Sequence, residues 1–149
     1  MKKFAKVLTL AMVMSVLATA AFAASATGTA TLDVIQALTI TKNQDLNLGQ
    51  VVQGDATGAT VATTDANAAS FTVTGQANAA LSVTVDSSVT LDDGSGNTIN
   101  VSLTNDATSP ALDATGSYTF HVGGSTGPIA SSQPVGTYTG TFNVTVDYQ

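Results

Sequence analysis

The chain has 149 residues and a formal net charge of −6 at pH 7, because four Lys are set against ten acidic residues, all of them Asp. A surface that binds nucleic acid or anionic lipid needs clustered Lys and Arg, so this composition excludes both kinds of partner. The chain has no Cys, which excludes disulfides, thiolate metal sites and Cys nucleophiles.

The start of the chain has the parts of a secretory signal peptide. Lys2, Lys3 and Lys6 give it a positive charge, an apolar run follows as far as Leu17, and Ala21-Phe22-Ala23 is a small-residue cleavage site. The apolar run is shorter than the roughly 20 residues that a bilayer-spanning helix needs. We therefore expect a signal peptide at residues 1–23 rather than a membrane anchor.

Cleavage after Ala23 would leave residues 24–149, a length that suits a single β-sandwich domain of ordinary size. Three Lys leave with the signal peptide, so the mature chain is three units more negative than the −6 of the full sequence. We expect the mature protein to be secreted, on a bacterial cell surface or in the periplasm.

The first patterned segment of the mature chain follows the small, polar residues 24–31. Its apolar positions are Leu32, Val34, Leu38 and Ile40. Spacing in steps of two is typical of a strand with one buried face. The segment has no Pro and a single acidic residue, Asp33, so these apolar residues are a candidate polymerisation strand that completes the sheet of another subunit. The alternative, that the segment pairs within its own domain as a first strand, stays open.

The middle of the chain repeats short alternating segments separated by turn-forming residues. The predicted strands are 46–52 with a bulge at Gly49, 59–63, 71–75, 81–85, 89–91, 99–103 and 118–122. We predict one hairpin from 71–75 to 81–85 and a second from 89–91 to 99–103.

The stretch Tyr138–Tyr148 has the clearest alternation in the chain and is predicted to form a long strand central to the core. The residues on its inward phase are Tyr138, Gly140, Phe142, Val144, Val146 and Tyr148. Phe120 is predicted to join them in the core. Tyr138 lies two residues after Gly136, where its hydroxyl can reach back to nearby backbone. Some nine strands with frequent turns predict an all-β sandwich or barrel.

Few residues suggest chemistry. His121 is the single His and lies on the polar phase of its strand, so we interpret it as a surface residue. Residues 92–97, DDGSGN, offer oxygen ligands for calcium, but they are also ordinary turn residues, and we prefer the turn. Residues 123–127 are rich in Gly but lack the Lys of a phosphate loop. We predict no enzyme activity, no cofactor, and no catalytic, cofactor-binding or metal-binding residues.

Four stretches resemble a known family. They are ATLDVIQALTI with LNLGQV, ASFTVTG, LDATGSYTFHVGG and QPVGTYTGTFNVTVDY, which span nearly all of residues 30–148. In these stretches the chain is similar to the bacterial domain-of-unknown-function family 4402, a group of exported pilin-like β-domains. The resemblance implies an Ig-like, pilin-like antiparallel β-sandwich with Greek-key character and a surface or fimbrial role. His121 departs from the apolar or aromatic residue expected there.

The export signal, the uncharged Thr-rich and Ala-rich strands and the lack of a chemical site favour a structural role. We expect a subunit of an extracellular filament, fimbria-like assembly or surface coat. Its subunits could be joined by β-strand complementation. Its partners would be further copies or other surface subunits. The alternative is a monomeric Ig-like module that binds carbohydrate or protein. Sugar sites usually need exposed aromatic residues, and here most aromatic residues fall on inward phases.

Overall fold

The structure is a computed structural model that describes residues 23–149. The signal peptide predicted at residues 1–23 lies outside the described residues except for its last position. The chain divides into two units between Asp33 and Val34. From residue 23 to residue 33 the chain has no regular secondary structure and every residue is exposed.

The unit Val34–Gln149 contains eight strands. They are β1 (Thr39–Gln44), β2 (Thr60–Val61), β3 (Ala69–Thr74), β4 (Leu81–Val85), β5 (Ser88–Asp92), β6 (Thr98–Asn105), β7 (Ser117–Ser125) and β8 (Val144–Tyr148). Residues 23–149 contain no helix, and so no helix in this part of the chain is long and apolar enough to cross a membrane.

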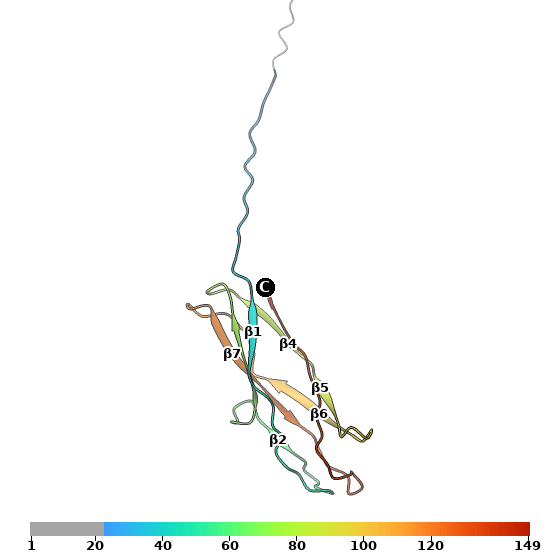
Figure 1. Ribbon diagram of the computed structural model, residues 1–149. Helices are drawn as coiled ribbons and strands as arrows, with labels where there is room; N and C mark the ends of the chain where they lie inside the picture. The colour runs from blue at the N-terminus through green and yellow to red at the C-terminus, as the bar shows by residue number, and fades with distance from the viewer. Residues whose placement is uncertain (1–22) are drawn as a thin grey trace, which may run out of the picture. The chain divides into compact units, whose positions relative to one another are not determined.

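The larger sheet has the order β1-β3-β7-β6-β5, with β2 pairing with β7 as well (Figure 1). All its ladders are antiparallel. Alternation explains which way its strands face: on β7, Phe120 and Val122 are buried, whereas Thr119 before them is exposed and His121 between them is partly exposed. The predicted hairpin from 89–91 to 99–103 is confirmed as β5 and β6, which pair from Ser88↔Ser102 to Asp92↔Thr98.

The smaller sheet consists of β4 and β8, which pair from Leu81↔Tyr148 to Val85↔Val144. The predicted hairpin from 71–75 to 81–85 is therefore wrong, because β3 pairs with β1 and β7 while β4 belongs to the other sheet. The connecting backbone is hydrogen-bonded elsewhere: the Gly75 N–H donates to Gly116 O at 3.0 Å and the Asn78 N–H to Asp113 O at 3.1 Å.

The core lies between the two sheets, so the predicted all-β sandwich is confirmed. Its fully buried large side chains come from four strands: Phe120, Leu81, Val73, Val101 and Val122. The Phe71 ring stacks on Phe120 with centroids 5.5 Å apart and meets the edge of Phe142 at 6.2 Å. Burial of such apolar surface is the main favourable contribution to folding.

Two of the predicted strands, 46–52 and 138–148, differ from the observed structure. The final strand begins at Val144 rather than Tyr138, and residues 140–143 belong to no strand. Phe142 is half-buried before the strand, and Val144 and Val146 are half-buried within it, where the strand pairs on one side only, with β4. The strand predicted over 46–52 does not form either, since residues 45–59 have no regular strand structure. Alternation marks a face, but a strand also needs a hydrogen-bonded neighbour.

Candidate functional site

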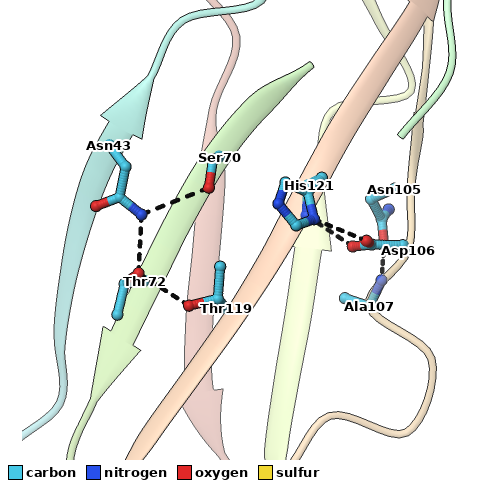
Figure 2. A network of polar contacts seen from close by, with 8 residues as sticks. All are labelled: Asn43, Ser70, Thr72, Asn105, Asp106, Ala107, Thr119 and His121. Atoms are coloured by element: carbon cyan, nitrogen blue, oxygen red, sulfur yellow. Dashed lines mark hydrogen bonds and ion pairs between the residues drawn. The ribbon is translucent and has the colours of Figure 1, made fainter. Parts of the chain in front are cut away.

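His121 lies on β7 and is joined to the loop after β6. Its Nδ1 is 3.0 Å from Asp106 Oδ2, and its backbone N–H donates to Asp106 Oδ1 at 2.7 Å (Figure 2). Asp106 thus contacts both the ring and the backbone of one residue. The Asp106 side chain is exposed and that of His121 is 40 % exposed, so the pair fastens a surface loop to the sheet.

The same polar face continues across β7, β3 and β1. Thr119 and Thr72 share a hydroxyl hydrogen bond of 3.0 Å, and Asn43 Nδ2 donates to Thr72 Oγ1 at 2.8 Å (Figure 2). Cross-strand bonds of this kind stabilise the register of neighbouring strands. These contacts explain the pattern of polar residues without requiring a bound molecule.

Residues 92–97 form the predicted turn between β5 and β6. Asp93 Oδ1 accepts from the backbone N–H groups of Ser95 at 2.8 Å and Asn97 at 3.1 Å, and Oδ2 accepts from Asn97 Nδ2 at 2.7 Å. These bonds, the Asn97 side chain foremost, hold the pKa of Asp93 below its usual range because they favour the charged carboxylate. Within residues 23–149 there is no group of three or more His, Asp or Glu side chains placed to hold a metal ion.

A groove of about 1250 Å³ lies on the unit Val34–Gln149 and has room for a partner. Two stretches of chain line it, residues 45–53 and residues 133–140 together with Phe142. Further apolar side chains line it from the larger sheet and from the loop after β7: Val89, Leu91, Ile99 and Ile129. Asp45 is its single charged lining residue, so the groove presents a mostly apolar surface.

The groove continues toward β1 as a smaller hollow of about 120 Å³. This hollow shares Asp45, Leu46 and Phe142 with the groove and adds Lys42 and Ala69. The Lys42 Nζ is paired with Asp45 Oδ1 at 2.5 Å in an exposed ion pair. The apolar surface therefore follows the chain from β1 as far as residue 53.

Both stretches that line the groove alternate like strands but take part in no ladder among the described residues. Leu46 and Leu48 are half-buried with Asn47 exposed between them, and Phe142 is half-buried with Thr141 exposed before it. In residues 133–143 the sole strand-like pairing is the isolated bridge Thr139↔Asp92. Backbone suited to a strand, without a strand partner, thus lies along an open apolar groove.

Tyr138 fixes the conformation of one side of the groove. Its hydroxyl donates to Pro134 O at 2.8 Å, which confirms the predicted reach back to nearby backbone. Gln133 Nε2 donates to the same hydroxyl at 2.9 Å, and Gln53 Nε2 donates to Gln133 O. These contacts join the two lining stretches at one end and hold the groove in shape.

The residues of the candidate polymerisation strand are mostly open to solvent. Leu32 is 86 % exposed and Val34 87 % exposed, while Ile40 on β1 is 41 % exposed. Leu38 is half-buried and packs against the core. The four residues thus differ: Leu38 packs against the core and Ile40 lies on β1, whereas Leu32 and Val34 lie outside any strand.

Sequence reasoning identified some of this site and missed the rest. The Leu46–Leu48 alternation and the Tyr138–Tyr148 alternation were both visible in the sequence, yet neither indicates a shared groove. Ile129 was missed because it lies in a loop without periodicity. It is 8 % exposed, and its N–H donates to Asp55 O at 2.8 Å, a contact between residues far apart in the sequence.

The fold defines an all-β, antiparallel sandwich domain with an open groove. A family model described as "Domain of unknown function (DUF4402)" matches residues 38–148. The match covers most of the chain, so the chain belongs to the DUF4402 family, as the resemblance predicted. A search of curated proteins found no match to this chain.

Proposed function

We propose that this chain is an exported structural subunit of an extracellular filament, fimbria-like assembly or surface coat, and that its subunits join by β-strand complementation. The observation that carries the proposal is the exposed alternating segment around Leu32 and Val34, which are 86 % and 87 % exposed. Aliphatic side chains gain about 1.5–3 kcal/mol each from full burial. Covering both would therefore contribute about 3–6 kcal/mol, against which the cost of bringing two subunits together is set.

Open strand edges support the same proposal. Among the described residues β1 has a ladder with β3 alone, and β8 has a ladder with β4 alone. Each of these edges leaves a row of backbone N–H and C=O groups that a further strand can pair with. A subunit with an exposed strand-like segment and an open edge has both halves of a self-association contact.

The remaining expectations follow from the sequence. The signal peptide predicted at residues 1–23 places the subunit outside the cytoplasm, on a bacterial surface, secreted or in the periplasm. The partners are further copies of the chain or other surface subunits. The role is structural rather than enzymatic, and the alternative is a monomeric extracellular module for adhesion to carbohydrate or protein.

The test compares the exported chain with a double variant in the exposed segment. We expect the wild type to form oligomers or filaments in sedimentation velocity and negative-stain microscopy. Leu32→Asp with Val34→Asp should abolish assembly, because a charge is costly to bury at an apolar contact. Thr29→Asp with Thr31→Asp adds the same charge on the opposite phase of the strand and should still assemble.

A wild-type chain that stays monomeric at all accessible concentrations would contradict the proposal and favour the adhesion module. Assembly of the Leu32→Asp, Val34→Asp variant at the wild-type concentration would show that this segment is not the contact.

A further inference from the structure

We propose that the groove lined by residues 45–53, residues 133–140 and Phe142 is the acceptor site, and that it receives residues 24–35 of a second copy as an added strand between these two stretches. The inference rests on the proposed function, which states that subunits associate but does not say which surface accepts the segment. It assigns that surface to one place in the fold.

The size of the groove fits a chain segment better than a small molecule. Pockets for small ligands usually have volumes of about 300–1,000 Å³, whereas this groove has about 1250 Å³ and follows two long stretches of chain. A strand rises roughly 3.3 Å per residue, so residues 24–35 would extend over about 40 Å. Residues 45–53 would cover at most about 30 Å if fully extended, and they bend at Gly49, with φ +73°, and at the turn that begins at Val52, so the segment is long enough to follow them.

The chemistry of the segment matches that of the groove. Leu32 and Val34 lie on one face of an extended segment, with Asp33 on the other face. The groove offers apolar surface from Leu91 and Phe142 and a single charged lining residue. Insertion would bury the two aliphatic side chains and leave the carboxylate of Asp33 facing solvent, where it needs no partner.

The strand would lie between the two lining stretches because neither of them takes part in a ladder among the described residues. Asn143 is already held by Asp86, since its C=O accepts from the Asp86 N–H at 3.1 Å and its N–H donates to Asp86 Oδ2 at 2.7 Å. An added strand would supply hydrogen-bonding partners to residues 140–142 and to the stretch 45–53. The inserted segment contains no Pro, so all its N–H groups can pair.

The contact runs from one part of a subunit to a different part of the next. Such a heterologous contact does not use a twofold axis and continues from copy to copy unless the geometry closes a ring. Each subunit would donate one segment and accept one. A groove blocked in one copy and a segment blocked in another would then leave a single intact contact between the two.

The experiment uses this complementarity in the full exported chain. The donor variant is Leu32→Asp with Val34→Asp, and the groove variant is Val51→Glu with Ile99→Glu. Val51 and Ile99 are half-buried groove residues outside the set that packs against the core. Thr84→Glu, on the exposed side of β4, is the control for added charge. Melting curves of each variant establish that it is folded.

We expect each variant alone to remain monomeric at concentrations at least about tenfold above those at which the wild type and Thr84→Glu assemble. An equimolar mixture of the two variants should give a heterodimer and nothing larger. In hydrogen exchange, the amides of residues 140–142 and of residues 45–53 should become protected in the wild-type assembly and in the groove variant's partner chain within the heterodimer.

The outcomes separate the inference from the proposed function. If the wild type assembles and the folded groove variant assembles equally well, the acceptor site is elsewhere and the inference fails while the proposed function stands. If the wild type assembles but the mixture gives no heterodimer, the segment does not enter the groove of a second copy. If the wild type never assembles, the proposed function itself fails. Protection confined to β5 or β1 would place the contact on another edge.

Discussion

Phe120 and Phe142 show how differently two aromatic residues contribute to one core. Phe120 is fully buried, stacks on Phe71 at 5.5 Å and lies 6.1 Å from the Tyr118 ring. Phe142 is half-buried and lines the groove, where part of its ring is open to solvent. The sequence placed both on inward phases, and only the structure distinguishes the centre of the core from its margin.

Phe120→Ala should lower the free energy of unfolding by about 3–5 kcal/mol, the usual cost of truncating a buried Phe. Phe142→Ala should cost less in the monomer, because its ring already loses part of its contact with the core to solvent. Urea titrations of the two variants and of the exposed control Thr119→Ala measure this order. Equal midpoints for Phe120→Ala and Phe142→Ala would contradict it.

The strands themselves were largely predictable, and their partners were not. Alternation located β3, β4, β5, β6 and β7 within a few residues, because a half-buried strand must alternate. The β5–β6 hairpin followed from its turn sequence. The β1–β3 and β4–β8 ladders join distant segments, and a period of two says which face is buried but not which neighbour supplies the hydrogen bonds.

The candidate site was predictable in part for the same reason. The segment that contains Leu32 and Val34 was identifiable from its alternating apolar residues, a pattern that is visible in the sequence alone. The groove depends on two stretches, near Leu48 and near Tyr138, that meet only after folding. The turn predicted at residues 92–97 is present, and Asp93 is hydrogen-bonded within it.

The pairing of β2 with β7 depends on Gly123, a residue without a side chain. A Cβ placed on Gly123 would collide with Val61 O and lie 3.0 Å from the backbone of Ala62 and Thr63. Backbone atoms cannot rotate away as a flexible side chain can. β2 can therefore pair beside Gly124 only while Gly123 remains small.

Gly123→Ala should destabilise the domain by about 1–3 kcal/mol, the usual cost of overpacking. Thermal unfolding against Gly136→Ala provides the comparison, because a Cβ on Gly136 would meet nothing closer than 3.9 Å. A Gly123→Ala variant that melts with the wild type would mean that β2 moves aside without cost. In that case the pairing of β2 with β7 contributes little to stability.

The net negative charge of the whole molecule opposes its self-association. Each copy carries a formal charge of −6, and cleavage of the predicted signal peptide makes it more negative. Copies of like charge repel, whereas the groove and the segment proposed to fill it are mostly apolar. Salt therefore acts mainly on the repulsion between subunits.

Assembly should become stronger when NaCl rises from about 10 mM to about 150 mM, because the screening length falls from about 30 Å to about 8 Å. Sedimentation velocity at fixed protein concentration across this range measures the effect. Assembly that weakens with salt would instead indicate ion pairs at the contact. Such a result would direct attention to the exposed Lys42–Asp45 pair beside the groove.

The β4–β8 ladder has a kinetic consequence. It joins residues 81–85 to residues 144–148, so β4 has no strand partner until a loop of roughly sixty residues closes. Non-local pairings of this kind make all-β domains fold slowly, in about milliseconds to seconds. During that interval Leu81 and the backbone of β4 are uncovered, and a strand from a neighbouring chain can reach them first. Correct folding and mispairing then compete in time, and the yield of native subunit should fall as the concentration of unfolded chains rises.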